Sequence, residues 1–126
     1  MKKYIAIASF SGALAVMLGA FGAHALKKIL SVSELNSFET GVRYQMIHSL
    51  LLLIVMLIPM ITEHQKKRIA KFLIFGVVCF SGSIYLLTLG VVPSKYIWFV
   101  TPLGGLLLLA SWIMIGIDVL KQKTTL

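Results

Sequence analysis

The sequence predicts an all-α membrane protein in which four transmembrane helices form an antiparallel bundle. Hydrophobic residues make up 59% of the 126 residues and charged residues only 13%, whereas soluble domains carry about 25% charged residues. A helix needs about 20 mostly apolar residues to cross a bilayer. Four stretches reach this length, and we place them at residues 4–26, 42–61, 72–92 and 97–117 of a single domain that covers residues 1–126.

The net charge of +8 does not indicate a nucleic-acid-binding protein. The basic residues form short clusters beside the apolar stretches, as membrane topology requires, and do not follow one solvated face. If both termini are cytoplasmic, four of the 12 Lys and Arg residues lie in external segments and the other eight in cytoplasmic ones. The external four are Lys27, Lys28, Arg43 and Lys95. This bias predicts cytoplasmic termini.

Small residues recur along one face of the first stretch, at Ala8, Gly12, Ala15, Gly19 and Ala23. Between helices in lipid, small side chains allow close backbone approach and van der Waals contact. We expect this face to pack against a neighbouring helix of the same chain, and a dimer interface is the alternative. The glycines expected at helix contacts are Gly12, Gly19, Gly22, Gly82, Gly104 and Gly105.

The segment between the first two stretches contains Ser31 and Glu34, which have the spacing of a capping box. Apolar residues then follow at three-residue intervals up to Phe38. This pattern predicts a short amphipathic helix at the membrane surface that ends or bends near Gly41.

The second stretch carries polar residues into the membrane, where they are costly unless they find partners or a function. Glu39 and Arg43 are four residues apart, which predicts an interfacial ion pair. His48 lies about 9 Å below the start of its span, at about 1.5 Å per residue. An unpaired imidazole at that depth would be unfavourable, so we expect a partner among Tyr44, Gln45, the third span or His24.

The third stretch adds a stripe of hydroxyl groups on one helical face. These hydroxyls can bond to carbonyls of their own helix or face the polar residues of the second span. The sequence therefore predicts a polar intramembrane cluster, structural or functional, drawn from His24, Tyr44, Gln45, His48, Ser81, Tyr85 and Thr88.

The fourth stretch opens with Thr101 and Pro102, and only a short connection separates it from the third. These two spans must therefore be antiparallel neighbours. Tyr96 and Trp98 stand where an interfacial aromatic belt is expected.

The sequence contains no recognisable nucleophile–base pair, phosphate-binding glycine loop or paired carboxylates. We therefore predict no enzyme, no cofactor and no metal. His24 and His48 do suggest a haem or metal site, because neutral imidazole is a good ligand, but two histidines alone are a weak metal signal.

Motifs in all four stretches resemble those of a family of small bacterial membrane proteins known as domain of unknown function 423, or uncharacterised protein family 0382. The similar segments are GAFGAHALK, FETGVRYQMIHSLLLL, FSGSIYLLTLG and TPLGGLLLLASW, in the same order as in the family. The resemblance implies a four-helix protein of the bacterial inner membrane and implies no activity. The motif positions include His24, Tyr44, Gln45, His48, Ser81, Gly82, Tyr85, Thr101, Pro102, Gly104 and Gly105.

Three kinds of function remain open from the sequence. The first is a non-enzymatic structural component that binds lipid, a partner membrane protein or further copies of itself. The second is a small oligomeric transporter or channel with a polar path centred on His48, since polar residues at membrane depth often line such paths. The third is a haem- or metal-binding protein that uses His24 and His48.

Overall fold

The computed structural model describes residues 1–123, and no residue in that range lies in a strand. Four long helices follow one another: α1 (Lys2–His24), α2 (Val32–Leu57), α3 (Glu63–Thr88) and α5 (Val100–Leu120). A 3-10 turn, η1 (Leu26–Lys28), connects α1 to α2, and the one-turn helix α4 (Ser94–Ile97) precedes α5. Four helical segments are long and apolar enough to cross a membrane, which confirms the predicted fold class.

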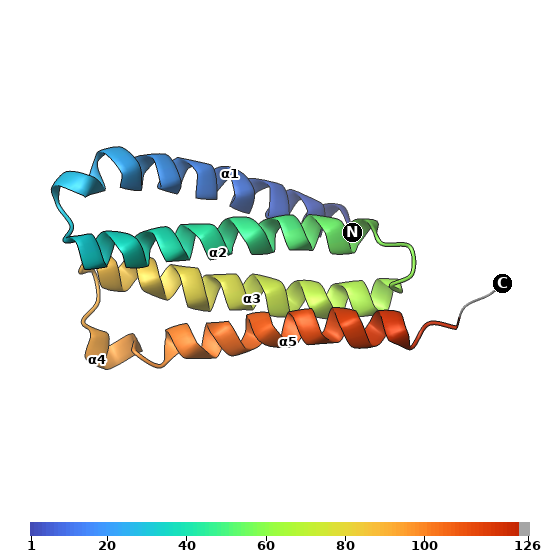
Figure 1. Cartoon of the computed structure of the whole chain (residues 1–126). Coiled ribbons are helices and arrows are strands. Elements are labelled where there is room, and N and C mark those ends of the chain that lie inside the picture. The colour runs from blue at the N-terminus through green and yellow to red at the C-terminus, as the bar shows by residue number, and fades with distance from the viewer. Residues whose placement is uncertain (124–126) are drawn as a thin grey trace.

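The helices pack in chain order, with α1 against α2, α2 against α3 and α3 against α5. Figure 1 shows them side by side, with α1 beginning and α5 ending at the same end of the bundle. The two middle helices have the larger share of buried residues, and the outer two have the smaller share and are more exposed. This exposure is expected of helices that face lipid rather than water.

The largest hydrophobic cluster lies in the half of the bundle where α1 begins. Tyr4 and Ala8 of α1 pack there among residues from the end of α2 and the beginning of α3, and Leu108 of α5 joins them. The α2 and α3 members are Leu51, Leu52, Val55, Met56, Ile69, Ala70 and Leu73, with Ile61 from the connecting loop. All four long helices therefore contribute to this cluster.

The expected surface helix between the first two spans is not a separate element. The capping box is present, because the Glu34 amide donates to Ser31 Oγ at 3.1 Å and the Ser31 amide donates to Glu34 Oε1 at 3.0 Å. The helix that starts there, however, continues without a break through Gly41 to Leu57. Gly41 is buried against Ile84 and the Tyr85 ring, so the glycine permits close packing on α3 and does not end the helix.

The ends of the spans also differ from those predicted by apolar length. α2 ends at Leu57 because Ile58, which precedes Pro59, is extended (φ −74°, ψ 114°). α3 starts at Glu63, nine residues before the apolar run, because Thr62 and Gln65 form a second capping box. His64 therefore lies in the first turn of α3.

The predicted small-residue face of α1 packs against α2, as expected. An added Cβ at Gly22 would lie 3.0 Å from the Phe38 ring, and one at Gly19 would lie 3.5 Å from Val42. Gly12 faces Ser49 at the looser distance of 4.0 Å. This face is therefore filled by a helix of the same chain.

The closest glycine contact joins α3 and α5. A Cβ on Gly104 would lie 2.3 Å from the Phe80 backbone nitrogen, which leaves room for no other residue. Gly76, not singled out from the sequence, is nearly as restricted, since its Cβ would lie 2.7 Å from the Leu108 side chain. In contrast, a Cβ on Gly105 would make ordinary contact with Phe80 at 3.7 Å, and one on Gly82 would meet nothing within 4 Å. Gly82 is therefore not a packing glycine.

Candidate functional site

His48 is 5% exposed and uses both of its ring nitrogens. The Trp112 indole N–H donates to His48 Nε2 at 3.0 Å, so this nitrogen is an acceptor and carries no hydrogen. The hydrogen is then on Nδ1, which donates to the Tyr44 carbonyl oxygen at 2.7 Å. The ring is therefore held as one neutral tautomer between α2 and α5.

The predicted need for a partner of His48 is met in a way that the sequence did not indicate. Tyr44 contributes its backbone carbonyl, while its ring stacks on Phe80 with 4.6 Å between centroids. Trp112, which was not among the expected partners, lies 64 residues further along the chain. With no free lone pair, His48 has no nitrogen available for a metal in this arrangement.

Gln45 is the centre of a separate hydrogen-bond network that connects α1, α2 and α3. Its Nε2 donates to the Ser11 carbonyl oxygen at 2.9 Å, and its Oε1 accepts from the Tyr85 hydroxyl at 2.7 Å. Ser49 Oγ lies 2.7 Å from Ser11 Oγ and 2.6 Å from the Gln45 carbonyl oxygen. Ser11 was missed from the sequence, although its place beside Gly12 on the small-residue face was a signal.

The hydroxyl stripe of α3 is divided between two roles. Ser81 donates to the Gly41 carbonyl oxygen of α2 at 2.6 Å, whereas Thr88 bonds to the Ile84 carbonyl of its own helix at 2.8 Å. Ser83, outside the stripe, pairs with Thr101 of α5. Among the described residues, no buried side-chain nitrogen or oxygen lacks a partner. These polar groups thus hold the helices together.

His24 does not belong to this cluster. It is exposed at the end of α1, where the contacts of Gly12 with Ser49 and Gly22 with Phe38 set the register. By that register His24 lies about 12 residues from the level of His48, or about 18 Å at about 1.5 Å per residue. The two histidines therefore cannot share a metal or haem, and residues 1–123 contain no group of three His, Cys, Asp or Glu suited to a metal ion.

The expected ion pair between Glu39 and Arg43 is not formed. Both side chains are exposed, and such pairs gain little because ordering two long side chains offsets the attraction. Within residues 1–123 the ion pair joins Arg68 of α3 to Asp118 of α5, at 2.8 and 2.9 Å to the two carboxylate oxygens. The Asp118 side chain is only 4% exposed, so this pair fixes the other end of the bundle.

Two adjoining hollows lie on α3 between α2 and α5, and we call them together the α2–α5 groove. The first is polar and lies toward the start of α2, where it is lined by Ser33, Glu34, Ser37, Thr40, Ile84, Leu87, Thr88 and Thr101. The second is largely aromatic and apolar and is lined by Arg43, Tyr44, Ile47, His48, Phe80, Gly105, Leu108, Leu109 and Trp112. One helical turn separates Thr40 from Tyr44 and Thr101 from Gly105, so the two hollows follow one another along the same helices.

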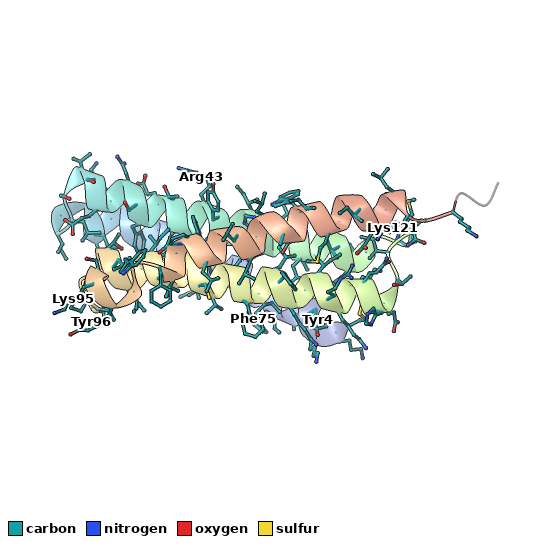
Figure 2. The ribbon with its side chains drawn as sticks, turned by 90° about the horizontal axis from the view of Figure 1, so that it is seen from below. Tyr4, Arg43, Phe75, Lys95, Tyr96 and Lys121 are labelled. Atoms are coloured by element: carbon teal, nitrogen blue, oxygen red, sulfur yellow. The ribbon has the colours of Figure 1, made fainter. Side chains whose placement is uncertain are left out.

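Arg43 lines the second hollow, about one turn of α2 beyond Thr40 of the first. Figure 2 shows it on the outer side of α2, on the side of the bundle opposite Tyr4 and Phe75. Within residues 1–123 no carboxylate lies within 4.0 Å of its guanidinium. The α2–α5 groove therefore combines an end lined by Ser and Thr residues with Glu34, a cation that forms no ion pair within residues 1–123, and an aromatic and apolar end.

Comparison with known proteins agrees with the resemblance found in the sequence. Residues 18–105 match the family described as "Protein of unknown function (DUF423)". A UPF0382 membrane protein of Staphylococcus saprophyticus is 38% identical over 96% of this chain and 99% of its own length. A UPF0382 membrane protein of Haemophilus influenzae is 35% identical over 98% of each chain. The UPF0382 inner membrane protein YgdD of Escherichia coli K12 is 36% identical over 92% of this chain and 88% of its own.

No solved structure is significantly similar to this chain. The family match covers most of the sequence, and the relatives are similar over nearly their full lengths. With four helices long and apolar enough to span a bilayer, the chain belongs to the DUF423 (UPF0382) family of membrane proteins.

Proposed function

We propose that this protein is a non-enzymatic membrane component that binds a phospholipid in the α2–α5 groove. The headgroup phosphate lies at Arg43, beside the hollow lined by Ser and Thr residues, and one acyl chain lies along Tyr44, Ile47 and Trp112. One observation carries the proposal. Along the groove, hydroxyl groups are followed by the Arg43 cation and then by aromatic side chains.

The chemistry of the groove matches that of an amphiphile. Guanidinium groups bind phosphate oxygens through charge-assisted hydrogen bonds. The apolar part can receive a chain without displacing polar groups, since His48 and Trp112 already satisfy each other. The Tyr44 ring stacks on Phe80 and lines the same hollow as Arg43, so it offers an aromatic surface next to the cation.

We further propose that the protein resides in the bacterial plasma membrane with both termini in the cytoplasm. The relative from E. coli is named an inner membrane protein, and eight of the 12 basic residues lie at the end of the bundle where α1 begins and α5 ends. Lys95 and Tyr96 mark the other end (Figure 2). A transport path centred on His48 has less support, because both ring nitrogens are engaged inside the chain.

The groove can be blocked at a position where folding should be unaffected. A Cβ on Gly105 meets only the Phe80 ring at 3.7 and 3.8 Å, so Gly105→Leu places its side chain in the groove. Gly116 on the same helix has nothing within 4 Å of its Cβ and does not line the groove, so Gly116→Leu is the matched control. Arg43→Gln removes the cation, and Lys28→Gln removes an exposed cation elsewhere at the same end.

The test uses the full chain in nanodiscs that contain a phospholipid with a photoreactive acyl chain. We expect crosslinks on the peptides that carry Ile47 and Leu109 to fall several-fold in Gly105→Leu and Arg43→Gln. They should stay unchanged in Gly116→Leu and Lys28→Gln. Equal crosslinking in all five proteins would show only bulk lipid contact and would refute the proposal.

A further inference from the structure

A second candidate site lies at the opposite end of the bundle, on the first turns of α3. It is a pocket lined by His64, Lys67, Arg68, Lys71 and Phe72, which we call the α3 basic pocket. Positions 64, 67, 68 and 71 fall on one side of a helix, three or four residues apart. This pocket shares no residue with the α2–α5 groove.

Only part of the positive charge in this pocket is paired with a carboxylate of residues 1–123. Arg68 is paired with Asp118 and is thereby held in place. Lys67 and Lys71 are exposed, and within residues 1–123 no carboxylate lies within 4.0 Å of either ammonium group. Like charges four residues apart on a helix repel each other, by about 0.2–0.5 kcal/mol. An anion between the two lysines would remove this repulsion.

Acidic side chains are scarce around the pocket. The chain has four, of which Glu34 and Glu39 lie in the first third of α2 at the other end. Asp118 is already engaged by Arg68. Glu63 stands four residues before Lys67 on the same helix, but it does not line the pocket and forms no ion pair within residues 1–123. Lys66, by contrast, has a defined partner, since it donates to the Met56 carbonyl oxygen at 2.9 Å. Among residues 1–123, Lys67 and Lys71 thus have no ion-pair partner.

The pocket continues into an apolar surface. Phe72 closes it on the membrane side, and Phe75, one turn further into the membrane, is 61% exposed. A soluble anion would use the lysines but not this surface. A phospholipid uses both, with its phosphate between Lys67 and Lys71 and its chains on the phenylalanines. Clusters of Lys and Arg next to the cytoplasmic end of a membrane helix attract anionic lipid headgroups.

We infer that the α3 basic pocket binds a phospholipid with a net negative headgroup from the leaflet at the end of the bundle where α1 begins. The zwitterionic phosphatidylcholine has the same phosphate but a compensating cation, which the lysines would repel. Binding should therefore favour phosphatidylglycerol. The inference is independent of the α2–α5 groove.

The experiment measures lipid binding to the full chain in detergent micelles by native mass spectrometry. Dioleoylphosphatidylglycerol, dioleoylphosphatidylcholine and inorganic phosphate are the three probes. All proteins carry Gly105→Leu, so that the α2–α5 groove does not contribute to the count. In this background, failure at the basic pocket is distinct from failure of the proposed function.

The double variant Lys67→Gln, Lys71→Gln should bind phosphatidylglycerol about 30-fold more weakly, or about fivefold for each lysine. The matched control is Lys121→Gln, Lys123→Gln, which removes two exposed charges at the same end but outside the pocket. The control should retain binding within about twofold. If the double variant does not fold, each single variant provides the same test at about fivefold.

Three results would overturn the inference. An equal loss in the control pair would show that only overall charge attracts the lipid. Equal binding of phosphatidylglycerol and phosphatidylcholine, or displacement of the lipid by millimolar inorganic phosphate, would show that the pocket does not select an anionic lipid.

Discussion

At the scale of single residues, the contacts of His48 show how a polar group is kept inside a membrane helix. The ring accepts from Trp112 on one side and donates to the Tyr44 carbonyl on the other, so no hydrogen-bonding capacity remains unused. Fully satisfied polar groups of this kind stabilise one arrangement of helices, because any other arrangement would leave them unpaired. Both ring nitrogens of His48 are therefore bound to groups of the protein itself.

Trp112→Phe and His48→Phe should each destabilise the fold, and a double-mutant cycle should show coupling of about 0.6–1.7 kcal/mol, as found for hydrogen bonds in membrane proteins. The measurement is unfolding in mixed micelles as the fraction of denaturing detergent rises. Tyr44→Phe is the control, because it removes a hydroxyl that forms no hydrogen bond within residues 1–123 and leaves the carbonyl in place. A coupling energy near zero would show that the indole–imidazole hydrogen bond contributes nothing to stability.

At the scale of helices, the contact between α3 and α5 depends on the absence of a side chain at a single position. Gly104 touches the backbone of α3 directly, and its neighbour Gly105 does not. Backbone cannot move away as the end of a flexible side chain can. The two adjacent glycines therefore have opposite tolerance to substitution.

Gly104→Ala should cost about 1–3 kcal/mol or more, because α3 and α5 must separate to admit the methyl group. Gly105→Ala should be neutral or stabilising by up to about 1 kcal/mol, because alanine favours helix and its Cβ finds ordinary contact. Both can be compared in the same detergent unfolding assay. Equal tolerance of the two substitutions would contradict the described contact.

The ion pair at the other end of these helices predicts an asymmetry between its two partners. Arg68→Gln leaves the buried Asp118 carboxylate unpaired and should cost about 3 kcal/mol. Asp118→Asn should cost less, about 1–2 kcal/mol, because the Arg68 side chain is 44% exposed and can turn to water. Unfolding of both single variants and of the double variant checks this. The double variant should be more stable than Arg68→Gln alone.

The sequence could predict the helices but not their contacts. Apolar length is set by bilayer thickness, so four spans were predictable. The capping boxes at Ser31 and Thr62 extend helices beyond the apolar runs, which length alone does not reveal. The burial of Gln45 and His48 was predictable, because unpaired polar groups are costly in lipid. Their partners Ser11 and Trp112 were not, because a linear pattern does not specify which helix faces meet.

At the scale of the whole molecule, the distribution of basic residues predicts how the protein is threaded through the membrane. Eight of the 12 lie at one end of the bundle, including those of the α3 basic pocket. Lys121 is at that end in Figure 2, and Lys95 is at the other. The same charges that direct insertion would then remain available to bind lipid.

The topology can be tested with single cysteines introduced in a Cys79→Ser background. Ser94→Cys should react with a membrane-impermeant thiol reagent in intact cells. Lys123→Cys should react only after permeabilisation and still leaves a bias of basic residues toward the cytoplasmic end. The opposite labelling pattern would reverse the proposed orientation and would place the α3 basic pocket in the outer leaflet.

The packing of helices in chain order has a consequence for synthesis. The helix that α1 contacts most is α2, the next long helix to leave the ribosome, and the helix that α3 contacts most is α5, the next long helix after it. Each of these two pairs can therefore form a hairpin during translation. The two hairpins then join through Gln45, Tyr85 and the Ser81–Gly41 hydrogen bond. A ribosome-bound chain truncated after α2 should therefore already contain a compact, protease-resistant helical hairpin.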